Sequence, residues 1–258
     1  MRIKLIPILL VIFSTASFSN DSIRYKTNLL GIQSGYGNFR YTDPLESENV
    51  NKGRYIPANF KWNTFSDKHY DELSFSYTSF NLNSSNSNDV DLTDIKTNCF
   101  YLSYAYYRRI LKPQKFLLYG GAKINNYLAF RDVSYTFISP VNSTQYYKNR
   151  DLFISLDIAL ATKIELGENF LLANFNSSIL SFVANRKYII DAKSESDLLF
   201  FPRFKSFGFS ANYYLKIASD LFFSAGYQFY YYSYPRSSDI LITKGGHSQL
   251  LAGIHFKF

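Results

Sequence analysis

The chain has 258 residues and a formal net charge of +8. Its one cysteine, Cys99, excludes an intramolecular disulfide, so the fold cannot depend on such a cross-link. A basic chain could bind nucleic acid, but no Lys/Arg cluster and no nucleic-acid-binding motif accompanies the charge. Beyond the N-terminal segment, no stretch is long and apolar enough for a membrane helix. We therefore expect no nucleic-acid partner and no helical membrane span.

The N-terminal segment, residues 1–19, has the composition of a secretory signal peptide. A basic start precedes the apolar stretch Leu5–Phe13, and small residues follow before Asn20. The alternative is a retained membrane anchor, which the short apolar stretch disfavours because a spanning helix needs about 20 residues. We expect cleavage of residues 1–19 and a single mature domain over residues 20–258.

The stretch Asp151–Leu166 shows the chain's clearest periodic pattern. Every second residue from Leu152 to Leu166 is aliphatic apart from Thr162, and the alternate residues include Asp157. A period of two predicts a β-strand with one apolar and one polar face. At this length, with one face suited to lipid, the pattern is typical of a transmembrane β-barrel strand.

The same pattern recurs along the chain and predicts about ten strands. Tight connections, as at Lys112–Lys115 and Gly167–Asn169, alternate with long polar connections, as at Asp132–Arg150. Closed membrane barrels show this alternation because their periplasmic turns are short and their extracellular loops are long. We predict an all-β, antiparallel, up-and-down barrel with both termini in the periplasm. Its expected strands are Lys26–Tyr41, Tyr55–Thr64, Asp71–Leu82, Lys96–Ile110, Phe116–Phe130, Asp151–Leu166, Phe170–Ala184, Ser206–Ala218, Leu221–Tyr232 and His247–Phe258.

The final strand carries a terminal pattern of alternating apolar residues, Ile254, Phe256 and Phe258. This ending resembles bacterial outer-membrane proteins of Gram-negative cells, which commonly finish in an aromatic residue on such a strand. The resemblance implies that these three residues form the signal read by the barrel-assembly machinery. It also implies residence in the cell outer membrane, with outer-membrane lipid and lipopolysaccharide as surroundings. Porins, adhesins, proteases and lipid-modifying enzymes share this fold, so the resemblance leaves the function open.

Strand parity also predicts which side chains face the lumen. Seven expected inward cations outnumber three carboxylates. Two interpretations remain open: a buried polar network, in which charges must be paired or hydrated, and a narrow anion-preferring pore. The charged and histidine side chains expected to line the lumen are Lys61, Glu72, Arg109, Lys123, Arg131, Asp157, Lys163, Glu165, Lys216, His255 and Lys257.

Enzymatic sites are weakly supported by the sequence. A protease resembling the ten-stranded omptins would need an Asp-x-His pair, and only the facing acidic pair has a counterpart, Asp89 and Asp91. A lipid A deacylase would need Ser and His on one face, whereas adjacent His247 and Ser248 point to opposite faces of a strand. His255 has no evident nucleophile nearby. We expect no catalytic residue, no metal site and no cofactor.

Two further features have alternative interpretations. Tyrosines clustered at Tyr230–Tyr234 and Tyr104–Tyr107 fit aromatic belts at the membrane interfaces, or carbohydrate stacking at the loops. The apolar run Asp197–Phe204 can extend the barrel wall, enter the barrel mouth or engage a partner.

The sequence therefore predicts a non-enzymatic outer-membrane barrel with two main alternatives for its function. The first is a small channel or ligand-binding barrel with a basic lumen. The second is a surface interaction or adhesion protein that has a plugged lumen and binds an extracellular partner through its long loops. An enzyme at the barrel rim is a minor third alternative.

Overall fold

The computed structural model describes residues 27–43, 47–84, 93–113, 115–137, 143–189, 195–200, 205–235 and 242–258, with backbone alone for 195–200 and for strand ends beside the gaps. The predicted signal peptide lies outside these residues. No helix among them is long and apolar enough to cross a membrane. The strands are β1 (Thr27–Asp43), β2 (Ser47–Tyr55), β3 (Ala58–Phe65), β4 (His69–Ser84), β5 (Thr93–Leu111), β6 (Phe116–Phe137), β7 (Ser143–Leu166), β8 (Asn169–Ile189), β9 (Glu195–Phe200), β10 (Lys205–Ala218), β11 (Leu221–Pro235) and β12 (Ile242–Lys257).

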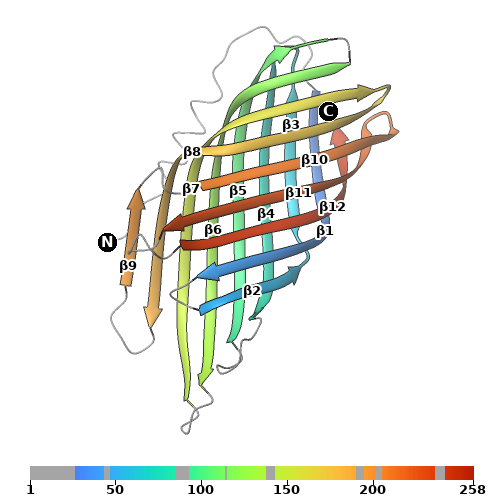
Figure 1. The fold of residues 1–258 in the computed structure, drawn as a ribbon. Helices are drawn as coiled ribbons and strands as arrows, with labels where there is room; N and C mark the ends of the chain where they lie inside the picture. Colours follow the sequence, from blue (N-terminus) through green and yellow to red (C-terminus); the bar gives the residue numbers. More distant parts are fainter. Residues whose placement is uncertain are drawn as a thin grey trace.

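These strands form one antiparallel sheet that closes on itself (Figure 1). The closing pair is β1 with β12, whose register runs from Leu29 opposite Lys257 to Thr42 opposite Lys244. β2 and β3 pair with β1 one after the other, so they form a single wall strand. That strand is interrupted at Pro57, which has no N–H to donate to the ladder. The predicted antiparallel barrel of ten wall strands is confirmed.

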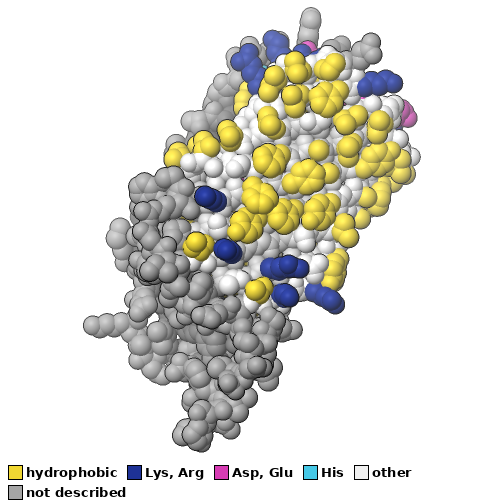
Figure 2. All heavy atoms as spheres, viewed as in Figure 1, with side chains coloured by type: hydrophobic (Ala, Val, Ile, Leu, Met, Phe, Trp, Pro, Cys, Tyr) yellow, Lys and Arg dark blue, Asp and Glu magenta, His cyan; other side chains and the backbone are white. Residues whose placement is uncertain are grey.

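Side chains alternate between the inside and the outside of the wall, as the period of two predicts. On β7, Ile158 and Leu160 are 60% and 49% exposed, whereas the intervening Ala159 is 3% exposed. The outer face carries a broad apolar area over the strands in view, with cationic side chains along its borders (Figure 2). An exposed apolar surface of this kind suits lipid rather than water.

The strands are longer than the sequence predicted. β6 and β7 contain 22 and 24 residues, about twice the 9–11 residues that a tilted strand needs to cross a bilayer. Much of the predicted long connection Asp132–Arg150 is therefore paired strand. Lys52 and Lys244, which lie outside the predicted strands, are likewise paired, in β2 and β12. These extensions do not contact lipid, so they lack the alternating apolar residues by which the sequence marks a membrane strand.

Short turns lie at the end of the barrel where β1 begins and β12 ends. Asn28 and Phe258 exchange backbone hydrogen bonds of 3.3 and 3.1 Å there. The turn between β7 and β8 contains Gly167, whose φ of 71° lies in the left-handed region that glycine adopts without strain. Because short turns and chain ends face the periplasm in barrels of this type, the extended end of the wall is the extracellular end.

Candidate functional site: the packed barrel interior

A carboxylate at the centre of the barrel interior joins two cations. Glu72 on β4 lies 3.4 Å from the ammonium of Lys61 on β3 and 3.6 Å from that of Lys123 on β6. It also accepts hydrogen bonds from Tyr70 at 2.9 Å and from Asn174 at 3.0 Å. β4 and β8 are not neighbours in the wall, so the Asn174 contact crosses the lumen. These contacts neutralise a carboxylate that is 2% exposed.

Two other buried carboxylates have their own partners. Asp157 accepts hydrogen bonds from the amides of Asn125, at 2.7 Å, and of Asn176. Asp151 pairs with Arg131, and both side chains are fully buried. The guanidinium of Arg131 also donates to the hydroxyl of Tyr41 on β1, across the lumen, at 3.1 Å. Parity indicates that Asp151 faces inward, but the sequence prediction omitted it.

The deeply buried charges of the described interior balance. Its cations are Lys61, Lys123 and Arg131, and its carboxylates are Glu72, Asp151 and Asp157. The predicted excess of positive charge is therefore not found in this part of the structure. It arose from counting cations near the periplasmic rim and from omitting Asp151.

The other predicted lumen cations lie toward the periplasmic end. Lys163, with 18% of its side chain exposed, pairs with Glu165 at 3.0 Å, while Lys257 is exposed. The ammonium of Lys216 lies 2.6 Å from the carboxylate of Glu168, in the turn between β7 and β8. This contact lowers the pKa of Glu168.

Arg109 makes a similar contact with the periplasmic turn between β3 and β4. Its guanidinium lies 2.8 Å from the carboxylate of Asp67, and the ammonium of Lys112 lies 3.3 Å from the same oxygen. Hydrogen bonds from both cations hold the pKa of Asp67 below its ordinary value. These contacts brace the turn rather than line a lumen.

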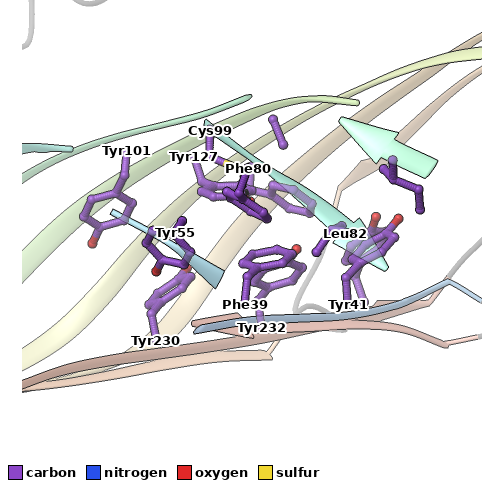
Figure 3. Close-up of a cluster of buried hydrophobic side chains, with 14 of the residues drawn as sticks. Phe39, Tyr41, Tyr55, Phe80, Leu82, Cys99, Tyr101, Tyr127, Tyr230 and Tyr232 are labelled. Atoms are coloured by element: carbon purple, nitrogen blue, oxygen red, sulfur yellow. Dashed lines mark hydrogen bonds between the residues drawn. The ribbon is translucent and has the colours of Figure 1, made fainter. Parts of the chain in front are cut away.

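An aromatic layer fills the extracellular half of the interior. Rings on β11 meet rings on the opposite wall: Tyr230 and Tyr101 have centroids 5.9 Å apart, and Tyr232 and Tyr127 have centroids 5.8 Å apart. Figure 3 shows the rings from the two walls pointing toward one another. Phe153 on β7 also packs against Tyr232, with ring centroids 5.0 Å apart, and so fills the space between the two walls.

A second aromatic layer fills the periplasmic half. Phe65 on β3 and Phe170 on β8 meet across the lumen with centroids 5.9 Å apart. Phe170 stacks on Tyr214 at 4.5 Å, and Tyr70 contacts Tyr119 at 5.8 Å. The polar cluster around Glu72 therefore lies between two packed layers.

The interior cavity at the polar cluster holds only about 20 Å³ and is lined by Lys61, Glu72, Tyr101, Lys123 and Asn176 among others. A single water molecule needs about 10–15 Å³ of such space. Within the described residues, the cavity is therefore large enough for one water and too small for a solute.

The residues considered for catalysis are separated or enclosed. His247 points inward with 8% exposure, and Ser248 belongs to the opposite face, as parity predicts. The statement that His255 has no nucleophile nearby is wrong, because its Nε2 lies 2.8 Å from the hydroxyl of Ser224. Both side chains are fully buried, however, and the described part of the interior leaves no route for a substrate to reach them.

The remaining candidates give no reactive site either. The thiol of Cys99 is buried on β5, 3.0 Å from the hydroxyl of Tyr127. The described residues contain no group of His, Cys, Asp or Glu side chains that could hold a metal ion. Asp89 and Asp91 lie outside the described residues.

The prediction for the tyrosine clusters is partly wrong. Tyr230, Tyr232 and Tyr234 are at most 4% exposed and form part of the interior layer, and Tyr107 is also buried. Neighbouring residues of a strand face opposite sides, so a run of tyrosines cannot all join an outer belt. Applied to these runs, the alternation of strand residues would have predicted one inward and one outward group of tyrosines.

Comparisons with solved structures place the chain among membrane barrels. The outer membrane protease OmpT from Escherichia coli superposes with a TM-score of 0.58 at 12% sequence identity, covering 94% of this chain and 98% of OmpT. The translocator domain of the autotransporter NalP from Neisseria meningitidis gives a TM-score of 0.50 at 9% identity, covering 98% and 96%. No protein-family model and no curated protein matches the sequence.

The chain has the bacterial outer-membrane β-barrel fold. Its closed ladder and apolar outer surface fit that environment, because a lipid bilayer tolerates no unpaired strand edges. The outer membrane is therefore its location. The structural likeness defines the fold, whereas the function has to be argued from this chain's own residues.

Proposed function

We propose that this protein is a sealed barrel that supports an extracellular contact surface and does not conduct solutes. The contacts across the lumen are the observation that carries the proposal. Tyr230 meets Tyr101, Asn174 meets Glu72 and Phe65 meets Phe170, so three successive levels are bridged by side chains from opposite walls. An open channel would require several of these pairs to separate together.

The extended wall supports the second half of the proposal. If about ten residues of β6 and β7 cross the bilayer, roughly ten more extend beyond it, or ~30 Å along each strand. The pairing continues to Phe137 opposite Ser143, so the extension is regular sheet rather than loop. Tyr146 on this extension is 57% exposed and offers a ring to a partner such as a carbohydrate.

The run at Asp197–Phe204 adds to the same surface. Its described part, β9, pairs with β8 from Phe182 opposite Phe200 to Lys187 opposite Glu195. This pairing makes wall extension the better of the alternatives considered for the run. We include this strand in the proposed contact surface and propose no catalytic role for the protein.

Conductance in planar bilayers tests the sealed lumen. We expect no single-channel events from the purified mature protein over a range of voltages. The variant Tyr101→Ala/Phe153→Ala/Tyr232→Ala should also stay closed, because the polar cluster and the periplasmic aromatic layer still bridge the lumen. Regular conductance steps from the unaltered barrel would favour the channel hypothesis instead.

Binding to a glycan array tests the proposed extracellular contact surface. Outer-membrane vesicles that display the barrel should bind members of a glycan array. Vesicles that display Tyr146→Ala should lose those signals, whereas Ile158→Ala, on the same face of β7 but within the apolar area, should retain them. Equal binding by vesicles without the protein would contradict this part of the proposal.

A further inference from the structure

A groove of about 1360 Å³ runs over the outer wall across β11, β12, β1, β2 and β4. Its lining includes Gly246 and Ser248, whose small side chains leave space between larger neighbours. Tyr227, Phe229 and Tyr231 on β11 form an aromatic side. Its exposed lining residues, among them Arg40, Lys52 and Lys244, belong to the outward face of the wall, so the groove opens on the outer surface.

Four cations line this groove: Arg40, Lys52, Arg54 and Lys244. All four are exposed, and Arg40 lies directly opposite Lys52 in the β1–β2 register. Like charges in directly opposed positions destabilise a strand pair. No ion pair or hydrogen bond among the described side chains compensates any of the four. An anionic ligand at this position would relieve the repulsion between these like charges.

The cluster of one charge sign is local. On the far wall at the extracellular end, Lys96, Asp132 and Lys148 face one another across β5, β6 and β7 with alternating sign. In the view that includes β12, β1 and β2, Lys and Arg side chains gather along the extracellular border of the apolar area (Figure 2). Charge on these three strands is thus concentrated where the lipid-facing surface ends.

The position of the groove, at the border of the apolar area, indicates an amphiphilic ligand. Along β1, the outward residues pass from Ile32, 69% exposed, through Tyr36, 44% exposed, to Arg40. Along β12, they pass from Leu250, 62% exposed, through Gly246 to Lys244. A ligand whose anionic head meets the cations therefore has its apolar part beside Tyr36 and Leu250.

We propose that this groove binds a phosphorylated glycolipid of the outer leaflet, of the lipid A type found in lipopolysaccharide. Its sugar phosphates contact Arg40, Lys52, Arg54 and Lys244, and its acyl chains follow the outward residues of β1 and β12 toward the apolar area. Guanidinium groups bind phosphate through paired, charge-assisted hydrogen bonds. Basic pockets beside the apolar surface of membrane proteins hold lipid head groups by the same chemistry. The site is independent of the sealed lumen and of the extracellular contact surface.

Native mass spectrometry of the mature barrel in detergent tests the proposal. The probes are bis-phosphorylated lipid A and the same lipid without its phosphates, with inorganic phosphate as a competitor. We expect one tightly bound phosphorylated lipid, weak binding of the dephosphorylated form, and no displacement by millimolar inorganic phosphate. The pair Lys52→Gln/Lys244→Gln should weaken phosphorylated-lipid binding by roughly tenfold, because each charge-assisted contact is stronger than a neutral one.

The pair Lys96→Gln/Lys148→Gln is the matched control, since it removes the same charge from the same end of the barrel. It should leave lipid binding unchanged. Both variants must show the heat-dependent gel migration of the unaltered barrel, which verifies folding. Equal weakening by the two pairs, equal binding of the dephosphorylated lipid, or displacement by inorganic phosphate would each overturn the proposal.

Discussion

At the scale of single residues, the interior depends on matching each buried charge with a partner. Glu72 serves two ammonium groups, and Asp151 serves one guanidinium. Removing one member of such a set leaves the other charges desolvated without compensation, which costs far more than the pair contributes in water. Exposed ion pairs at the periplasmic rim lack this penalty.

Glu72→Gln should destabilise the barrel by about 3–5 kcal/mol, because Lys61 and Lys123 then lose their shared carboxylate in a buried environment. Urea unfolding in lipid vesicles measures the change in midpoint. Glu165→Gln is the control, since Glu165 has 45% of its side chain exposed and should cost less than about 1 kcal/mol. Similar midpoints for the two variants would show that the Glu72 cluster is hydrated.

Asp67 should titrate below the ordinary aspartate range, because Arg109 and Lys112 favour its ionised form. A depressed folded-state pKa stabilises the fold above the unfolded-state pKa, and this stabilisation is lost as pH falls through the folded-state value. Carbon-13 NMR of the carboxyl group follows the titration. Arg109→Gln should raise the pKa toward the ordinary value, and an unchanged pKa would contradict the assigned cause.

At the scale of strands, the period of two explains which face meets lipid. Asp157, which parity placed on the inner face, is fully buried and accepts hydrogen bonds from amides, as the buried-network interpretation expects. Substituting Asp157 is therefore no neutral control for substituting a lipid-facing neighbour. A better control lies on the same face of β7, outside the apolar area.

Ile158→Arg should destabilise the barrel by roughly 2–4 kcal/mol, because it places a cation in hydrocarbon near the middle of the bilayer. Tyr146→Arg lies on the same strand and the same face, but on the extracellular extension, and should change stability by less than about 0.5 kcal/mol. Unfolding midpoints in vesicles of one lipid composition provide the comparison. If Tyr146→Arg were the more damaging change, the membrane level assigned to β7 would be wrong.

At the scale of the whole molecule, closure gives every wall strand two partners. The β1–β12 ladder joins the first and last strands along almost their entire length. Such a barrel resists detergent until heat disrupts the ladder cooperatively, because no exposed edge is available from which unpairing can begin.

The mature protein should therefore migrate faster in SDS gels before boiling than after it. Gly35→Pro should reduce the folded band, because a side chain there meets the carbonyl of Leu250 in the closing ladder and proline removes an N–H. Gly167→Ala, in an exposed turn with open space around it, should have a smaller effect. Identical migration before and after boiling would contradict a closed barrel.

The sequence by itself determined the barrel class, the strand number and the face of most side chains. Inside and outside differ in solvent, and alternation records that difference locally, as the pattern from Leu152 to Leu166 shows. Parity also identified Lys61, Glu72, Lys123 and Arg131 as inward residues. The extensions of β6 and β7 could not be predicted in this way, because their outer faces meet water rather than lipid and therefore lack the apolar residues that mark a membrane strand.

Only the tertiary structure decided which inward residues meet. Contacts such as Tyr41 with Arg131, 90 positions apart, depend on the stagger and closure of all ten wall strands. The same closure brings Arg40, Lys52, Arg54 and Lys244 into one groove from three strands. A period of two specifies a face but not a height along the barrel axis, so neither the contacts across the lumen nor the outer groove could be read from the sequence.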